Sequence, residues 1–327
     1  MNKTEADRRF NIFFIIKNSN KILLSFFLLL TLSCSSFMQK KNRSEKTFPE
    51  ICFGIREKNT KLSIRPEKIP SDDLETLRKH FSNNAISIAN DIGVTAQLLE
   101  YLSLGGKNKS HNRKLFIMKE VQERVTLSQM ELSSMTAIAD CERGRAMQLA
   151  SHLDTLTNDE TNTLAVRSIL STVVGTVLSA AIELTGGTAQ LYKAADLFFA
   201  FLAGHFAYQS LNLDIKGYLG HRNNILRELK DKPEKPELFY ASVWNFLNNE
   251  NYPNEISERG EILRLWEQNK GTEEDEKLIF SEGGDYTSGQ LYKLVSKYDS
   301  LKIRMAYMQL ELRQLLEELE KKEKEIL

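Results

Sequence analysis

Residue types that commonly carry out chemistry are few in this chain and irregularly spaced. The five histidines lie far apart, and none belongs to the His-Glu-x-x-His pattern that binds zinc. The sequence also has no phosphate-binding loop, no Gly-x-Gly-x-x-Gly stretch and no Gly-x-Ser-x-Gly nucleophile elbow. These absences indicate that the protein is not an enzyme, and they predict no catalytic residue, metal site or cofactor. The histidines are His80, His111, His152, His205 and His221.

One short run, residues 140–145, combines a cysteine with two acidic and two basic residues (Asp-Cys-Glu-Arg-Gly-Arg). It lies inside a helical pattern, where side chains three and four residues apart are neighbours. Opposite charges at that spacing are ordinary on a solvated helix face. We therefore expect an exposed, ion-paired surface here rather than a site.

The three cysteines, Cys34, Cys52 and Cys141, lack the close spacing of metal ligands. In an oxidising compartment, Cys52 and Cys141 are candidates for one disulfide. A buried free thiol at Cys141 is the alternative, because that residue lies within a helical pattern.

Residues 1–33 have the organisation of a signal peptide: five basic residues precede an apolar run of eleven, residues 22–32. The run ends at Ser33 and Cys34. This resembles a bacterial lipoprotein signal peptide, in which the cysteine is diacylated and becomes the new N-terminus. The sequence departs from that pattern at Thr31, where the family usually has leucine.

The resemblance implies a lipid on Cys34, and Ser35 after it implies sorting to the outer membrane, with the body facing the periplasm. An ordinary signal peptide and a membrane anchor are alternatives. A body held in the cytoplasm fits less well, because basic residues before the apolar run favour an N-terminus that stays inside.

Composition points to helices and gives no sign of nucleic-acid binding. The 327 residues include 44 basic and 44 acidic side chains, so there is no basic excess to attract phosphates. Six prolines and sixteen glycines are few for this length, which favours helix over β-sandwich. We predict an all-α fold: an elongated helical bundle with a central apolar helical hairpin and a long C-terminal coiled-coil helix.

The predicted hairpin, residues 164–213, is weakly charged and is divided by Gly186 and Gly187, a natural helix stop. Residues with small side chains are spaced four apart on each arm, where a partner helix can approach closely or the helix can enter a membrane. They are Ser171, Gly175 and Ser179 on the first arm, and Ala200 and Gly204 on the second.

The uncharged part of each arm is short for a membrane span. Residues 168–182 extend about 22 Å as a helix and residues 197–213 about 26 Å, against a hydrocarbon core of about 30 Å. We therefore interpret the hairpin first as the core of a soluble bundle. A hairpin that inserts conditionally into a membrane is the alternative.

Two long heptad patterns flank the hairpin. Apolar residues recur at the a and d positions from Met118 to Leu156, and again from Leu291 to Ile326. A capping-box pattern, Thr287 with Gln290, marks the start of the second. The two stripes can pair within one chain, or the C-terminal helix can pair with another subunit.

The remaining segments complete a four-part organisation. We predict a signal peptide at 1–33, a tether and irregular segment at 34–70, a helical bundle at 71–231, and short helices with an acidic loop and the C-terminal helix at 232–327. One helix is expected from Asp72 to about residue 104, a bend at Asn158 and Asp159, a short helix over residues 217–230, and a loop over 271–285.

Two functional hypotheses follow. The first is a lipid-anchored envelope protein with a structural or protein-interaction role, held to the membrane by its lipid and binding a partner or itself through the coiled-coil helix. The second is an α-helical pore-forming or membrane-inserting protein, because long helices around an apolar hairpin resemble the layout of bundle-type α-helical pore-forming toxins. That resemblance concerns organisation alone, without a shared motif.

Overall fold

The structure is a computed structural model whose described residues are Cys52, Pro66 and residues 68–104, 111–250 and 256–324. The chain divides into two units, Met1–Ser44 and Glu45–Leu327, and every described residue belongs to the second. The predicted signal peptide, Cys34 and most of the predicted tether lie outside the described residues. The second unit has a hydrophobic core made of its own side chains, so it has what it needs to fold without the first.

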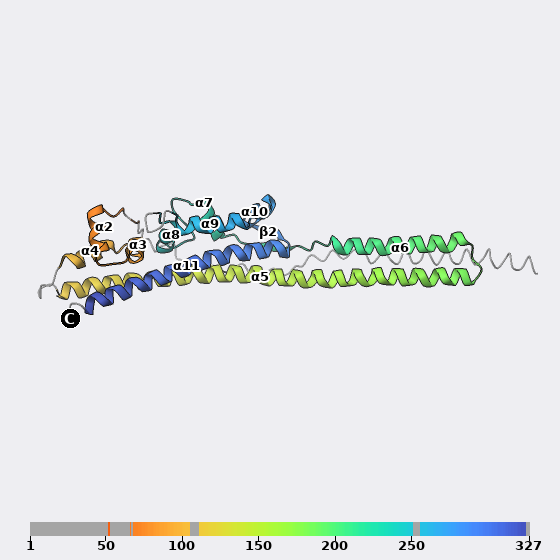
Figure 1. Ribbon diagram of the computed structural model, residues 1–327, viewed down its shortest axis with the longest axis horizontal. Helices are drawn as coiled ribbons and strands as arrows, with labels where there is room; N and C mark the ends of the chain where they lie inside the picture. Colours follow the sequence, from red (N-terminus) through yellow and green to blue (C-terminus); the bar gives the residue numbers. More distant parts are fainter. Residues whose placement is uncertain (1–51, 53–65, 67, 105–110, 251–255, 325–327) are drawn as a thin grey trace, which may run out of the picture. The chain divides into compact units, whose positions relative to one another are not determined.

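Ten α-helices and two short strands make up the described part of the chain (Figure 1), which confirms the predicted all-α helical bundle with a long C-terminal helix. The elements are α2 (Ser71–Arg78), α3 (Asn83–Asp91), α4 (Thr95–Ser103), α5 (His111–Leu184), α6 (Ala189–Leu211), β1 (Gly217–Gly220), α7 (Ile225–Asp231), α8 (Ala241–Asn248), α9 (Glu258–Gln268), α10 (Glu273–Ile279), β2 (Gly283–Tyr286) and α11 (Ser288–Lys324).

Helices α5 and α11 pack against each other in antiparallel fashion and carry the core (Figure 1). Both heptad stripes are buried along this seam, from Met118 to Leu153 on α5 and from Leu291 to Leu319 on α11. The Tyr292 hydroxyl donates to Asp154 at one end, and Lys302 pairs with Asp140 further along. The two stripes therefore meet within one chain.

Helix α11 begins where the capping box predicts. The Thr287 amide donates to Gln290 Oε1 at 2.9 Å, and the Gln290 amide donates to Thr287 Oγ1 at 3.3 Å. The prediction of an acidic loop over residues 271–285, before α11, is wrong, because this segment contains α10 and β2. A second capping box, between Thr272 and Asp275, starts α10.

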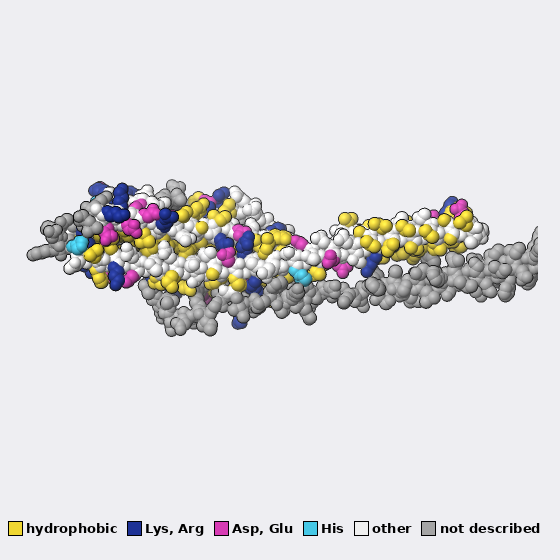
Figure 2. All heavy atoms as spheres, turned by 90° about the horizontal axis from the view of Figure 1, so that it is seen from below, with side chains coloured by type: hydrophobic (Ala, Val, Ile, Leu, Met, Phe, Trp, Pro, Cys, Tyr) yellow, Lys and Arg dark blue, Asp and Glu magenta, His cyan; other side chains and the backbone are white. Residues whose placement is uncertain are grey.

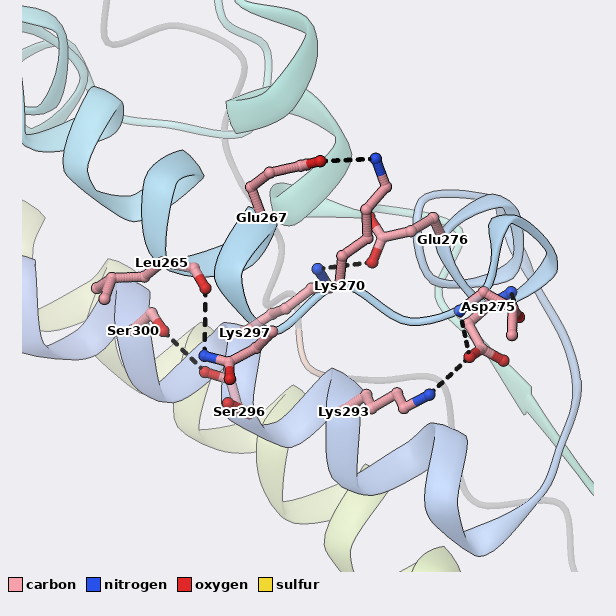
Figure 3. Close-up of polar contacts among 11 residues, drawn as sticks. Leu265, Glu267, Lys270, Asp275, Glu276, Lys293, Ser296, Lys297 and Ser300 are labelled. Atoms are coloured by element: carbon pink, nitrogen blue, oxygen red, sulfur yellow. Dashed lines mark hydrogen bonds and ion pairs between the residues drawn. The ribbon is translucent and has the colours of Figure 1, made fainter.

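Lysines of α11 hold α10 in place, as Figure 3 shows. Lys293 Nζ lies 2.7 Å from Asp275 Oδ2, and Lys297 Nζ lies 2.9 Å from Glu276 Oε1. Lys297 is buried, with the rings of Trp266 and Phe280 each 5.3 Å from its ammonium. Acidic residues predicted to lie in a loop thus anchor a helix to the core.

The prediction of one continuous helix from Asp72 to about residue 104 is wrong, because this segment forms three helices, α2, α3 and α4. Ser82 starts α3 by accepting a hydrogen bond from the Ala85 amide, and its own amide donates to Glu318 of α11. Gly93 has a φ of 73°, which a side chain disfavours, and it ends α3. Local capping and a distant carboxylate together override the continuous apolar pattern.

The other two predicted breaks also differ from the structure. Helix α5 continues without interruption through Asn158 and Asp159, where a bend was expected. Residues 217–220 form β1 rather than the start of a helix, and β1 pairs antiparallel with β2, with Gly217 opposite Tyr286. A Cβ on Gly217 would lie 2.9 Å from a methyl of Leu149, so glycine lets β1 lie close against α5.

Candidate functional site

The distal end of α5 and all of α6 form a two-helix projection, which we call the hairpin: α5 from residue 164 onward, together with α6. Helix α11 accompanies α5 only as far as Asp154, and the hydrophobic core ends on α5 at Leu153. Among the described elements, α6 packs extensively against α5 alone (Figure 1). The hairpin is therefore not the core of the bundle, which corrects the first interpretation of its sequence.

The two arms of the hairpin meet closely at a glycine. Gly175 is buried against Phe199, so close that an added Cβ would lie 2.6 Å from the Phe199 Cβ. The Ser168 hydroxyl donates to the Ala203 carbonyl at 2.9 Å. Nearer the tip, the Ser179 hydroxyl contacts the Tyr192 carbonyl oxygen at 3.2 Å and the carboxylate of Asp196.

The predicted small residues fall on different sides of the hairpin. Gly175 and Ser179 lie in the seam between the arms, and Ser171 is half-buried beside them. Ala200 and Gly204 are exposed and point away from α5, with open space around Gly204. The second arm contributes Ala195 and Phe199 to the seam instead. These two are also four apart, and spacing alone did not distinguish one stripe from the other.

The tip turns within four residues, 185–188. Gly186 has a φ of 79°, which glycine adopts without a steric cost. The Gly187 amide donates to the Ile182 carbonyl at 2.8 Å and so satisfies one of the last carbonyls of α5. The predicted helix stop at these glycines is where the chain reverses.

Large apolar side chains cover the outside of the hairpin and are open to solvent (Figure 2). Exposed fractions are 64% for Val177 and 73% for Leu197, and they reach 89% for Leu184 at the tip. In the view of Figure 2, hydrophobic side chains dominate this projection, and charged ones gather toward its two ends. The exposed apolar residues are Val166, Ile169, Leu170, Val173, Val174, Val177 and Leu184 of α5, and Leu191, Leu197, Phe201, Tyr208 and Leu211 of α6.

Hydroxyl groups on the α5 arm are satisfied within the protein. Every Ser and Thr from Thr163 to Thr185 donates to a backbone carbonyl oxygen. Most donate to the carbonyl four residues earlier in the same helix, as with Thr172 and Thr176, and two donate across the seam. Polar groups that already have partners can leave water at a much reduced cost.

Charged groups stand mainly at the ends of the hairpin. Arg167 lies near its base and Glu183 at its tip, about 24 Å apart along the helix axis. Lys193 lies within about 10 Å of the tip, close enough for its long side chain to reach the end of the hairpin. Asp196 is the one carboxylate further in, and it contacts Ser179.

Length and composition of α5 meet the requirements for crossing a membrane. It contains an apolar stretch of 18 residues, of which only 17% is buried. Among the described helices, α5 is the one that contains such a stretch. Low burial distinguishes this stretch from the core helix of a soluble protein.

The charged run at residues 140–145 is a structural anchor rather than the solvated face predicted for it. Glu142 and Arg145 are buried and share two hydrogen bonds, of 2.9 and 3.1 Å. Arg145 also donates to the carbonyl of Gly220 at the end of β1. Cys141 forms a disulfide with Cys52, with their Cα atoms 5.5 Å apart.

A histidine and a tyrosine complete this buried cluster beneath the sheet. His221 Nε2 lies 2.9 Å from the Tyr286 hydroxyl, which donates to the Leu278 carbonyl. Burial, with the nearby Arg145 charge, lowers the pKa of His221 to about 4, so the ring is neutral at pH 7. Burial raises the pKa of Tyr286. This neutral, enclosed pair joins the end of β1 to β2, and the Tyr286 hydroxyl joins β2 to α10, whereas Arg145 joins β1 to α5.

No family model, curated relative or solved structure matches this chain. The geometry of the described residues favours the hairpin as the functional site.

Proposed function

We propose that this protein is a lipid-anchored envelope protein that inserts its α5–α6 hairpin into a lipid bilayer. The observation that carries the proposal is the hairpin itself: a projecting pair of helices whose large apolar side chains have no protein cover among the described residues. Exposed apolar patches of this extent on soluble proteins mark surfaces that bind a membrane or another protein.

The distribution of these side chains favours a bilayer over a single protein partner. They lie on the outer sides of both arms, as Val173 and Val177 do on α5 and Leu197 and Phe201 on α6. A partner covers one side of a hairpin, whereas lipid surrounds it. The satisfied hydroxyl groups support the same proposal, because hydrocarbon offers them no other partner.

The length of the hairpin suits a thin membrane. About 24 Å separate Arg167 from Glu183, somewhat less than the roughly 30 Å of an average hydrocarbon core. The signal-peptide resemblance implies the bacterial outer membrane, and that membrane is thinner than average. The disulfide between Cys52 and Cys141 supports export, because such bonds persist in oxidising compartments.

A structural or interaction role is the second candidate, and one observation favours it. Ala200 and Gly204 form a small-residue surface on the outside of α6, where another helix can approach closely. The coiled-coil stripe of α11 supports it less, because α5 of the same chain covers that stripe.

Association with vesicles tests the proposal directly. Residues 35–327, made without the signal peptide and lipid, are mixed with vesicles of phosphatidylethanolamine and phosphatidylglycerol, and flotation and dye leakage are measured. We expect the protein to float with the vesicles. A protein that stays in the aqueous fraction at both neutral and mildly acidic pH would contradict the proposal and leave the interaction role.

A further inference from the structure

The two-stranded sheet is the point where the chain returns from the hairpin to the body. Only residues 212–216 separate the end of α6 from β1. Strand β1 lies against α5, where a Cβ on Gly217 would be 2.9 Å from a methyl of Leu149, and it pairs with β2. Among the described elements, α6 packs extensively against α5 alone. The attachment of β1 therefore fastens this end of α6 to the body.

His221 closes the sheet at the end of β1. Its side chain is 2% exposed, and its amide donates to the Glu282 carbonyl at 3.0 Å. Its Nε2 lies 2.9 Å from the Tyr286 hydroxyl, and that hydroxyl gives its own proton to the Leu278 carbonyl. Nε2 therefore carries the proton of the neutral ring and donates it to the hydroxyl oxygen.

The other ring nitrogen of His221 is where an added proton must bind. Nδ1 is buried and has no hydrogen-bond partner among the described residues. A proton on Nδ1 would create a buried cation with an N–H that finds no acceptor, and burying such a charge is strongly unfavourable. The geometry accepts the neutral ring and disfavours the charged one.

The two charges that act most on His221 are also positive. Arg145 of α5 donates to the Gly220 carbonyl, one residue before His221, and Arg227 of α7 is the second cation. Glu142 is the carboxylate on this side, and it already accepts two hydrogen bonds from Arg145. A charged imidazole would thus add a third cation to a buried cluster.

The other elements packed around the sheet bring no free negative charge to His221. Tyr286 of β2 and Tyr298 of α11 are neutral, because burial raises the pKa of both hydroxyls. On α10, which packs against β2, Asp275 and Glu276 are paired with lysines of α11.

We infer that the sheet is an acid-sensitive fastener: protonation of His221 opens the pairing of β1 with β2 and frees the end of α6 from the body. The inference does not depend on membrane insertion. Burial, with the Arg145 charge, lowers the pKa of His221 from 6.5 to about 4 in the closed sheet. In an open sheet the pKa returns to its ordinary value. The closed sheet is therefore most stable above pH 6.5, and this stability is lost as the pH falls toward 4.

Amide hydrogen exchange at pH 7 and pH 4.5 tests the inference in residues 35–327, with exchange times scaled to the intrinsic amide rate at each pH. Residues 217–221 and 282–286 report on the sheet, residues 207–211 on the end of α6, and residues 301–312 on the body. His221→Gln is the matched variant, because its side-chain amide can donate to Tyr286 as Nε2 does but takes up no proton. NMR of the histidine rings measures the pH at which His221 titrates in the unchanged protein.

We expect protection of the sheet in the unchanged protein to fall roughly 50-fold between pH 7 and pH 4.5, with faster exchange at the end of α6 and none in the body. In His221→Gln, protection of the sheet should change by less than about threefold. Equal loss in both proteins, or no loss in either, overturns the inference. Loss in the sheet with unchanged exchange in residues 207–211 overturns the release of α6. If His221→Gln does not fold, the NMR titration decides: a His221 ring that is protonated near pH 6 while the sheet stays protected overturns the inference, and protonation that coincides with loss of protection supports it.

Discussion

A single charge placed on the outside of the hairpin should abolish membrane binding. Leu197 is 73% exposed and lies about 12 Å along α6 from the start of that helix at the tip. Burying a leucine in an apolar environment is worth about 1.5–3 kcal/mol, so Leu197 contributes roughly 1.7 kcal/mol when lipid covers its exposed part. A carboxylate at that depth adds a cost of about 2.5–3.5 kcal/mol. Leu197→Glu should therefore weaken vesicle binding by about 4–5 kcal/mol, or roughly a thousandfold.

Flotation of Leu197→Glu over a series of vesicle concentrations measures this loss. The matched control is Ile303→Glu, which changes an aliphatic side chain that is 55% exposed on the outer side of α11. The control should bind as the unchanged protein does, and both variants should keep the same helical content. Equal binding by Leu197→Glu and the unchanged protein would refute the reasoning, because the hairpin would then not be the part that meets the lipid.

Three further predictions concern the folded chain. Gly175→Val should force the arms of the hairpin apart at a cost of about 1–3 kcal/mol, seen as faster amide exchange over residues 164–211 while the body keeps its melting temperature. Arg145→Met should lower the free energy of unfolding in urea by about 3–5 kcal/mol, because it removes the buried guanidinium that pairs with Glu142 and donates to the Gly220 carbonyl. Burial, with the Glu258 charge, raises the pKa of Glu311 from 4.5 to about 7, so its protonated form favours folding below pH 4.5 and this contribution is lost as pH rises through 7. Glu311→Gln should therefore stabilise the protein at pH 8 by up to about 3 kcal/mol in urea unfolding and have little effect at pH 4.5.

Controls in the same chain sharpen these tests. Gly204→Ala, in open space, should cost nothing, and hairpin exchange that rises equally in both glycine variants would contradict the role given to the Gly175 contact. Arg313→Ala removes an exposed pair and should cost less than about 1 kcal/mol. A Glu311→Gln effect that is the same at pH 4.5 and pH 8 would contradict the raised pKa. The free energy of unfolding of Glu311→Gln should still depend on pH, because burial also raises the pKa of Asp91.

Regular repeats made the long helices predictable. The heptad positions from Leu291 to Leu319 are all core residues, and the Thr287 capping box starts α11 at the expected residue. Patterns of this kind are local, so they can be read without knowing the fold. The sequence did not reveal which stripe would pair with which, and the structure supplies that pairing.

Features that depend on distant contacts were missed. Strand β1 exists because Gly217 pairs with Tyr286, a residue far along the chain, and its sequence alone resembles the start of a helix. The break before α3 depends partly on Glu318 of α11. The charged run at 140–145 shows the same limit: Glu142 stands at a core position of the heptad pattern, which was a sign of burial, but its partners could not be read from spacing.

The candidate site shows a different limit. An apolar helix has the same composition whether it fills a protein core or enters lipid, so residues 164–213 supported both interpretations. Burial separates the two, and burial depends on where α11 ends along α5. Spacing likewise could not separate the seam glycine, Gly175, from the outward-facing Gly204.

The depth of the hairpin in a bilayer is the most direct test of the account. Val177→Cys in residues 35–327 is labelled with a fluorophore sensitive to its surroundings, since this side chain is 64% exposed and far from the body. Quenchers attached deep in the lipid chains should then quench the fluorophore, and aqueous iodide should not. Quenching by iodide alone, in protein that floats with the vesicles, would show that the hairpin remains in water and would contradict the central claim.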